Sequence, residues 1–254
     1  MSELSKNIAL GAAAVGAGAV LVGATLLSTN SSLLSNGNSG SGGGNTVSVT
    51  VKEIHPTTTI TAPADDDVYF TSSLTASVNY VDSITFTNIL TAPNGSTCSL
   101  TPVGISDLSG TYTLAINLTE CQGGAKGEYH LTAYPIGYAN AGDTVTFYYA
   151  SFSIGTIFND NNGDPLVMVN YGAGIKKVLF DVTCAGTTVL DDYAYATEEN
   201  EDYIDEVLLP LKDKNVAKGT ACTLQATAAK SDGTAVGGSA GTASKTFTYA
   251  GLPY

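Results

Sequence analysis

The sequence contains no arginine and no tryptophan, and it has few charged residues of either sign. Only 13% of its 254 residues are charged, against about 25% in an ordinary soluble domain. All ten basic residues are lysines, and with 23 acidic residues the formal net charge is −13. Binding to nucleic acid requires clustered Lys and Arg side chains that neutralise phosphates. This composition therefore excludes nucleic acid as a partner.

The sequence also lacks the residue patterns of catalysis and of cofactor binding. It has only two histidines, His55 and His130. Neither can be matched with a Ser or Cys nucleophile and an acid at a recognised spacing, and no phosphate loop, dinucleotide fingerprint or zinc motif is present. His130 alternates with apolar residues, which is typical of a surface or half-buried strand residue. We therefore expect no enzyme activity and no cofactor.

Four cysteines are present, and their number and context predict disulfides. They are Cys98, Cys121, Cys184 and Cys222. An even number of cysteines behind an apolar N-terminal segment indicates an oxidising compartment. Sequence order favours the pairs Cys98–Cys121 and Cys184–Cys222, with buried free thiols as the alternative. The disulfides and the export segment together predict an extracellular or cell-surface protein.

Three sequons for N-glycosylation support the same location. Asn30, Asn94 and Asn117 each stand two residues before a Ser or Thr. Such patterns arise by chance in a chain rich in Ser and Thr, but together with export they become candidate glycan sites.

The N-terminal segment 1–28 is largely apolar and rich in small residues. In residues 7–27, eleven of 21 positions are Gly or Ala. On a helix, Ala12, Gly16, Ala19 and Gly23 would form a stripe of small residues, along which apolar helices can approach closely. This segment is predicted to be a hydrophobic helix that packs against other copies. A cleaved signal and a simple membrane anchor remain open. Residues 29–45 then form a flexible Gly/Ser/Asn linker.

From residue 46 onward the apolar residues recur at every second position, which predicts β-strands separated by Gly, Pro, Asn and Asp. The predicted strands include 46–54, 76–81, 83–89, 111–118, 129–136 and 143–154. TFYYA at 146–150 returns as TFTYA at 246–250, and 83–89 and 127–136 have counterparts at 177–183 and 220–229. A repeat of about 100 residues has the size of an immunoglobulin-like sandwich. The fold is therefore predicted as mostly β, with an N-terminal hydrophobic helix followed by two tandem immunoglobulin-like β-sandwich domains, 46–154 and 155–254.

Two acidic segments are candidates for cation binding. Asp160, Asn162 and Asp164 alternate like the start of a calcium loop, but Pro165 stands where such a loop needs Gly. They are weak candidates, and we expect no metal. Residues 191–206 hold eight carboxylates, and we interpret this run as a solvated loop between strands.

An apolar N-terminal helix, a Ser/Asn/Gly linker and Thr- and Tyr-rich sandwiches resemble the layout of archaeal surface-filament subunits. Within these subunits, the layout is similar to that of the type IV pilins and of the thread-like pili of thermoacidophiles. The resemblance implies a structural subunit of an extracellular pilus or adhesion filament whose partners are other copies of itself. Assembly would occur either through bundled helices or through donation of the strand 46–54 to the next subunit.

Two other functions fit the same layout. One is a spike on the surface of an archaeal virus. The other is a membrane-anchored module that binds carbohydrates or another surface, in which tyrosines would stack on sugars.

Overall fold

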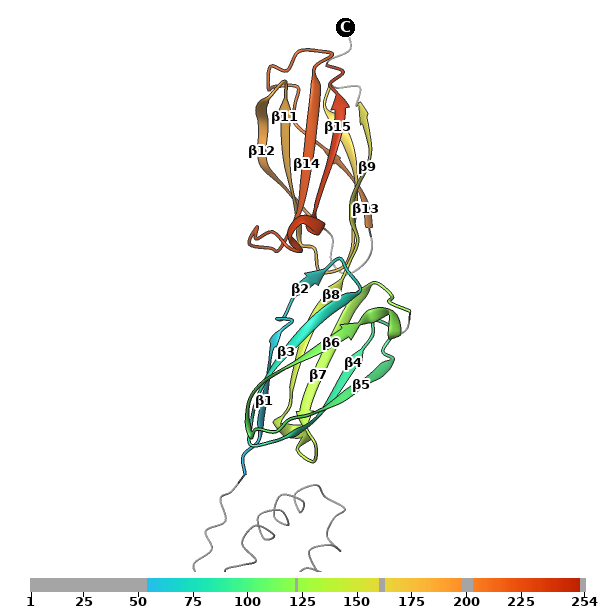
Figure 1. The fold of residues 1–254 in the computed structure, drawn as a ribbon. Coiled ribbons are helices and arrows are strands. Elements are labelled where there is room, and N and C mark those ends of the chain that lie inside the picture. Colours follow the sequence, from blue (N-terminus) through green and yellow to red (C-terminus); the bar gives the residue numbers. More distant parts are fainter. Residues whose placement is uncertain (1–53, 122, 160–162, 198–202, 252–254) are drawn as a thin grey trace, which may run out of the picture.

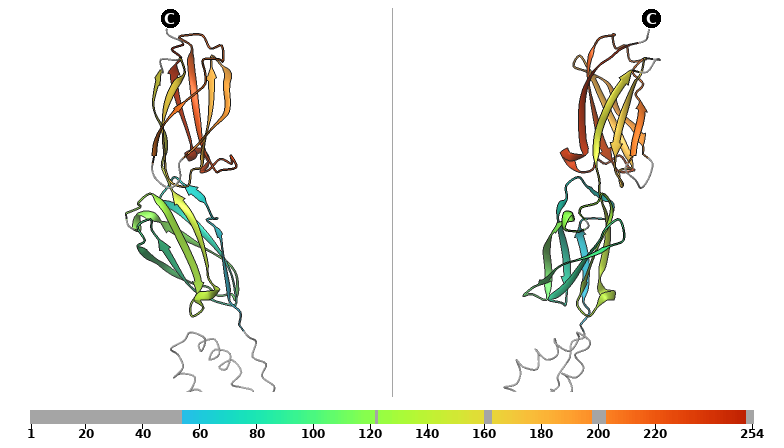
Figure 2. Two further views of the ribbon diagram at one scale, coloured as in Figure 1. Left: turned by 180° about the vertical axis from the view of Figure 1, so that it is seen from behind. Right: turned by 90° about the vertical axis from the view of Figure 1, so that its right-hand side faces the viewer.

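The computed structural model describes residues 54–121, 123–159, 163–197 and 203–251. The predicted helix with Ala12, Gly16, Ala19 and Gly23, the sequon at Asn30 and residues 46–53 of the predicted first strand lie outside the described residues. The described part is mostly β, as predicted, and it forms two sandwiches stacked end to end (Figure 1). Two further views show the same lengthwise stacking (Figure 2). Among the described residues, no helix has the length and apolar character needed to cross a membrane.

The N-terminal sandwich consists of a three-stranded sheet and a five-stranded sheet. The smaller sheet has the order β1-β3-β6, with β1 (Thr57–Ala62), β3 (Ser73–Val81) and β6 (Ser109–Asn117). The larger sheet has the order β2-β8-β7-β4-β5, with β2 (Asp67–Tyr69), β8 (Asp143–Tyr149), β7 (Gly127–Pro135), β4 (Thr85–Thr91) and β5 (Thr97–Gly104). Two short 3₁₀ helices, η1 (Leu118–Glu120) and η2 (Ala139–Ala141), lie in its connections.

The C-terminal sandwich pairs a three-stranded sheet with a four-stranded one. The first has the order β13-β10-β9, with β13 (Tyr203–Leu208), β10 (Pro165–Tyr171) and β9 (Phe152–Asn159). The second has the order β12-β11-β14-β15, with β12 (Thr187–Ala196), β11 (Lys177–Cys184), β14 (Ala221–Ala229) and β15 (Thr242–Thr248). A 3₁₀ turn, η3 (Gly238–Gly241), precedes β15.

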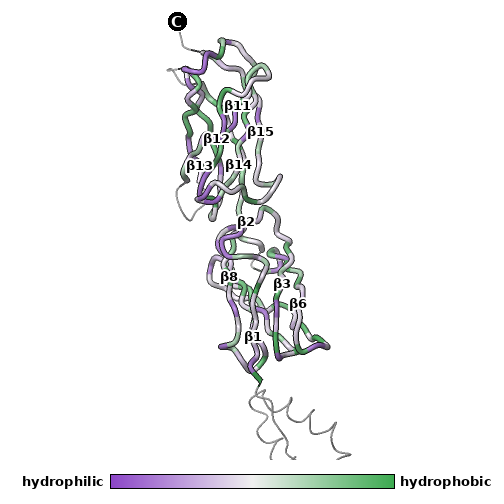
Figure 3. The backbone as a smooth tube through the Cα atoms, turned by 90° about the vertical axis from the view of Figure 1, so that its left-hand side faces the viewer, coloured by the Kyte–Doolittle hydropathy of each residue, from purple (hydrophilic) through white to green (hydrophobic). Residues whose placement is uncertain are grey.

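Alternating side chains build a separate core in each sandwich. In β3, every second residue from Leu74 to Tyr80 is buried, and β11 and β14 show the same alternation. Colouring by hydropathy shows polar and apolar residues mixed along the strands (Figure 3). Phe86, Tyr129 and Phe147 are fully buried in the first core, and Phe180 and Leu224 in the second. Removal of this apolar surface from water is the main stabilising term of both sandwiches.

The three internal sequence repeats occupy corresponding strands. TFYYA ends β8 and TFTYA ends β15, while the other two pairs of segments form β4 with β11 and β7 with β14. One difference separates the two copies. The short strand β2 pairs in parallel with the end of β8, whereas no described strand pairs with the outer edge of β15.

One strand prediction is wrong in detail, and one strand was not predicted. The stretch 143–154 is not one strand, because the chain leaves β8 at Ala150 and enters β9 after Ser151. The backbone partners change there: Ala150 N–H donates to Tyr69 O in the first sandwich, while Ser151 O accepts from Gly172 N–H in the second. The buried positions change phase there, from Val145 and Phe147 to Tyr148 and Ala150. The run of adjacent aromatic residues 147–149 hides this change in the sequence pattern. Strand β1 was also not among the predicted strands.

The acidic run 191–206 is likewise not a loop throughout. Its first six residues belong to β12 and its last four to β13, while residues 198–202 lie outside the described residues. Asp191 and Asp192 lie at a bulge, where the pairing with β11 shifts between Leu190 and Tyr193. The Asp192 N–H donates to the Asp181 carboxylate at 2.8 Å. An extra residue at a bulge accommodates polar side chains that a regular ladder would exclude.

Tyr112 and Asn88 form a buried polar pair in the first core. The Tyr112 hydroxyl donates to Asn88 Oδ1 at 2.7 Å, and Asn88 is fully buried. Burial raises the pKa of Tyr112 to about 12, because the phenolate would lose its hydration. In an unfolded chain the phenol ionises near pH 10. Below pH 10 the phenol is neutral in both states, and the fold keeps its full stability. Between pH 10 and pH 12 the unfolded chain ionises more readily, so the free energy of unfolding falls.

We expect Tyr112→Phe to change the alkaline stability in two ways. At pH 7 the free energy of unfolding should fall by about 1–2 kcal/mol, because buried Asn88 Oδ1 loses its donor. Between pH 10 and pH 12 the free energy of unfolding of the unsubstituted protein should fall by about 1.4 kcal/mol more per pH unit than that of the variant. Urea unfolding followed by circular dichroism at pH 7, 10 and 11 measures both. Equal slopes in the two proteins would contradict the assignment.

Candidate functional site

The joint between the two sandwiches is packed rather than open. Val68, Tyr148 and Ala150 of the N-terminal sandwich belong to the same hydrophobic cluster as the core of the C-terminal sandwich. Only two residues separate β8 from β9. The joint is thus a continuation of the second core, and the two sandwiches form one elongated unit (Figure 1).

Glycines allow two aromatic rings to enter this joint. A Cβ atom on Gly174 would lie 2.4 Å from Cγ of Tyr148, and one on Gly237 would lie 2.1 Å from Cε2 of Phe70. Both glycines have positive φ, +84° and +70°, which other residues rarely adopt. An ion pair between Lys230 Nζ and Asp67 Oδ1 at 3.4 Å lies across the joint. The sequence predictions missed these residues; the glycines that follow β10 and precede β15 are the only local signal.

Exposed apolar side chains gather at the free end of the N-terminal sandwich, here called the N-terminal pole. The pole is formed by the loops 82–84, 105–108 and 136–142, beside the start of β1. Seven large apolar side chains are exposed among the described residues, and four of them lie here, namely Val81, Ile84, Leu108 and Ile136. Leu108 is 59% exposed. The chain enters the structure at this pole, so residues 1–53 connect to it directly.

The other three exposed apolar side chains lie on one face of the C-terminal sandwich. Phe158 and Leu208 flank Leu166 in register across β9, β10 and β13, and Ile204 lies further along β13. Directly opposed residues of neighbouring strands share a face. The N-terminal pole and this face of the C-terminal sandwich are therefore two different surfaces, and each carries exposed apolar groups.

The unpaired edge of β15 borders a shallow groove of about 360 Å³. Thr156 and Ile157 line one side, and Lys245–Thr248 lines the other. Lys245 Nζ donates to Gly155 O at 2.6 Å and closes part of the groove. A lysine at an edge strand discourages unspecific pairing with other strands.

The structure pairs the four cysteines in the order in which they occur. Cys98 on β5 is joined to Cys121, which follows η1, and Cys184 on β11 is joined to Cys222 on β14. Cys184 and Cys222 are directly opposed in neighbouring strands and are both buried. The first disulfide ties an edge strand to the connection between β6 and β7, whereas the second lies within one sheet.

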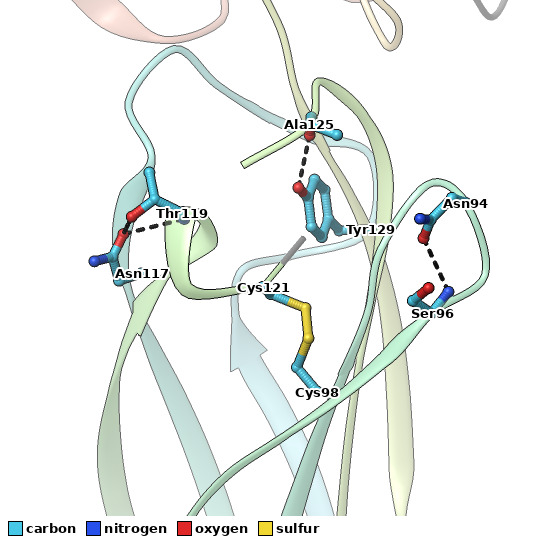
Figure 4. Close-up of a disulfide and its surroundings, with 8 residues drawn as sticks. All are labelled: Asn94, Ser96, Cys98, Asn117, Thr119, Cys121, Ala125 and Tyr129. Carbon is cyan, nitrogen blue, oxygen red and sulfur yellow. Dashed lines mark hydrogen bonds between the residues drawn. A yellow bond between two sulfur atoms is a disulfide. The ribbon is translucent and has the colours of Figure 1, made fainter. Parts of the chain in front are cut away.

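Two of the three sequons lie at the end of the N-terminal sandwich that faces the joint (Figure 4). Asn94 is exposed in the tight turn between β4 and β5. Asn117 is half-buried at the end of β6, where its side-chain oxygen caps η1. Both sites are close to the Cys98–Cys121 disulfide, and Figure 4 shows that their side chains lie on either side of it.

Of the three weak calcium candidates, only Asp164 lies among the described residues. Asp160 and Asn162 lie outside the described residues. Asp164 is buried, and its Oδ1 accepts from the Lys212 backbone N–H at 2.7 Å. Within residues 54–251, gaps aside, no group of three His, Cys, Asp or Glu side chains has the arrangement of a metal site.

The remaining polar candidates have structural partners. His130 lies on β7 with Nδ1 3.0 Å from Thr146 Oγ1 and Nε2 3.1 Å from Glu128 Oε1. In the acidic run, Asp205 accepts hydrogen bonds from the hydroxyls of Tyr171 and Tyr195. The hydrogen bonds of Asp205 link side chains of β10, β12 and β13 across the two sheets of the C-terminal sandwich.

No protein-family model and no curated protein matches the chain. The solved structures with some likeness to it include the BSP domain of a biofilm-associated protein, a 1.5-MDa bacterial ice-binding adhesin, and a tandem of titin Ig domains. Their TM-scores are 0.25, 0.25 and 0.27, with 15%, 16% and 12% identity over 77%, 80% and 77% of this chain. This chain spans 30%, 66% and 97% of those three chains, so it covers less than two thirds of the first two. Likenesses with TM-scores this low establish neither a shared fold nor a shared function.

Proposed function

We propose that the protein is a structural subunit of an extracellular filament, and that it assembles with other copies of itself. The observation that carries the proposal is the gathering of exposed apolar side chains at the N-terminal pole, where the chain continues into residues 1–53. Contiguous apolar groups on a surface mark contacts with other molecules. The partner in this proposal is a second copy of the chain.

The difference between the apolar surface at the N-terminal pole and the one on the C-terminal sandwich favours an open filament over a closed pair. A contact between two unlike surfaces repeats from copy to copy and produces a fibre unless the rotation closes a ring. The packed joint fixes the distance between the two ends, which is what a regular fibre needs. The two disulfides suit an oxidising, extracellular location.

The segment that joins the copies can act in two ways. The predicted helix 1–28 can bundle with its neighbours, or the predicted strand 46–54 can add to a sheet edge of the next copy. The edge of β15 is the acceptor that we propose for the second case, because the corresponding edge of β8 is already occupied by β2.

Electron microscopy of the native material tests the proposal. We expect uniform fibres from the full-length protein and none after deletion of residues 1–54, which removes both candidate joining segments and leaves β1 intact. Deletion of residues 1–28 alone should retain fibres if strand addition is the mechanism and abolish them if helix bundling is. Isolated single copies, or copies seen only on virus particles, would overturn the proposal in favour of a binding module or a virion spike.

A charge at the N-terminal pole should block assembly without unfolding the protein. Leu108→Asp adds a carboxylate at an exposed position, so the free energy of unfolding should change by less than about 0.5 kcal/mol. Fibre yield should fall at least tenfold, because the carboxylate would have to be desolvated in the contact. Thr223→Asp, at an exposed position on β14, is the matched control and should leave the yield unchanged. Equal yields from both variants would show that the pole is not the contact.

A further inference from the structure

The two described sequons place the side-chain amides of Asn94 and Asn117 in different surroundings. In an N-glycosylation sequon the acceptor is Nδ2 of the asparagine, so the surroundings of that atom decide whether a transferase can use it. Asn94 and Asn117 lie near the same disulfide (Figure 4) and therefore belong to the same part of the fold. They differ in exposure, in hydrogen bonding and in the rigidity of the residues that follow.

Asn94 lies in a turn whose described hydrogen bonds are local. Ala92 N–H donates to Ser96 O at 2.8 Å, and Gly95 N–H donates to Ala92 O at 2.9 Å. Asn94 Oδ1 accepts from Ser96 N–H at 3.0 Å. This bond orients the side chain and leaves Nδ2 without an acceptor among the described residues. A Cβ atom placed on Gly95 would meet nothing within 4 Å, so the space around the turn is open.

The amide of Asn117 is engaged at both of its polar atoms. Oδ1 accepts from Thr119 N–H at 3.2 Å and from Thr119 Oγ1 at 2.7 Å, and Nδ2 donates to Glu120 Oε1 at 3.1 Å. The middle residue of the sequon, Leu118, is fully buried. The next turn ends at Cys121, which is joined covalently to Cys98. The sequon at Asn117 therefore cannot leave the surface without opening the core.

We propose that, of the two described sequons, Asn94 is the one that is glycosylated in the folded protein, and that the fold and the Cys98–Cys121 disulfide keep Asn117 unmodified. The donor is an oligosaccharide linked through phosphate or pyrophosphate to a lipid. Nδ2 of Asn94 forms a bond to C1 of the first sugar, the bond between C1 and the phosphate oxygen breaks, and the lipid phosphate leaves. The amide loses one proton in the exchange, and nothing is oxidised or reduced.

The chemistry explains why the fold decides between the two sites. An amide nitrogen is a weak nucleophile, so the transferase must surround and polarise it while holding the Ser or Thr two residues later. A turn closed by its own hydrogen bonds can be drawn into such a cleft with little change in the sandwich. The Asn117 segment would have to lose its three hydrogen bonds and expose Leu118.

Mass spectrometry of peptides from the native protein tests the proposal. We expect oligosaccharide on Asn94 and an unmodified Asn117, with an occupancy ratio of at least ten. Asn94→Gln should remove the glycan mass from this part of the protein, and Asn117→Gln should leave it unchanged. No glycan on Asn94, or equal occupancy of both sites, would overturn the proposal.

Two further variants separate the effect of the fold from that of the sequon. The double change Ser96→Thr with Thr119→Ser exchanges the third sequon residue and should leave the order of occupancy unchanged. The double change Cys98→Ala with Cys121→Ala should raise the occupancy of Asn117 several-fold without changing that of Asn94. Circular dichroism of this variant shows whether it remains folded. A reversed order in the first variant would overturn the proposal, and so would an unchanged Asn117 in a second variant that melts at lower temperature.

Discussion

Replacement of Gly174 by alanine is expected to destabilise the protein by about 3–5 kcal/mol and to loosen the joint between the two sandwiches. The new Cβ atom would lie 2.4 Å from Cγ and 2.5 Å from Cδ2 of Tyr148. Tyr148 is buried on β8 and cannot move aside without disturbing the joint. A side chain at φ +84° adds a backbone cost of about 1–2 kcal/mol, and the overlap accounts for the rest.

Gly186→Ala is the matched control for this experiment. Gly186 has a similar φ of +80°, but a Cβ atom there would meet nothing within 4 Å. Gly186→Ala should therefore lower the free energy of unfolding by only about 1–2 kcal/mol, which is the cost of placing a side chain at a positive φ. Urea unfolding gives the free energies, and small-angle X-ray scattering and proteolysis between β8 and β9 report on the joint. Equal losses from the two variants, with unchanged scattering, would show that the joint does not depend on this contact.

Removal of the Cys184–Cys222 disulfide is expected to lower the free energy of unfolding by about 4 kcal/mol. This is the second large effect that we expect. The bridge closes a loop with a sequence separation of 38, and closure of a loop of this size restricts the unfolded chain by about that amount. Both cysteines are buried between β11 and β14. The double change Cys184→Ala with Cys222→Ala should therefore lower the midpoint of urea unfolding strongly.

The Cys98–Cys121 pair provides the comparison. Its separation of 23 predicts a smaller loss, about 3 kcal/mol. Cys98 is only partly buried, so a mild reductant should open this bridge first under native conditions. Thiol labelling followed by mass spectrometry measures the order. Earlier reduction of Cys184–Cys222 would contradict the burial argument.

Much of the sandwich architecture follows from the period of two in the sequence. Val178, Phe180 and Val182 alternate with polar or half-buried residues, and all three are fully buried in β11. The repeats also mark the strands that take corresponding places in the two copies. The cysteine order indicates the pairs that the structure contains.

The features that the sequence did not reveal depend on contacts between distant residues. The break between β8 and β9 arises because Ala150 and Ser151 bond to different sandwiches. The difference between Asn94 and Asn117 depends on Glu120 and on the buried position of Leu118, which a three-residue motif does not encode. The joint depends on rings that fill the space beside two glycines.

The parallel pairing of β2 with β8 has a mechanical consequence. The chain enters the first sandwich at the N-terminal pole and leaves it at the opposite end, so tension along the molecule pulls these two strands in opposite directions. Their hydrogen bonds are then loaded together rather than one after another. In the described part of the second sandwich no such pairing protects β15. There the bond between Cys184 and Cys222 limits extension, because the residues between them cannot lengthen under load until that covalent link is broken.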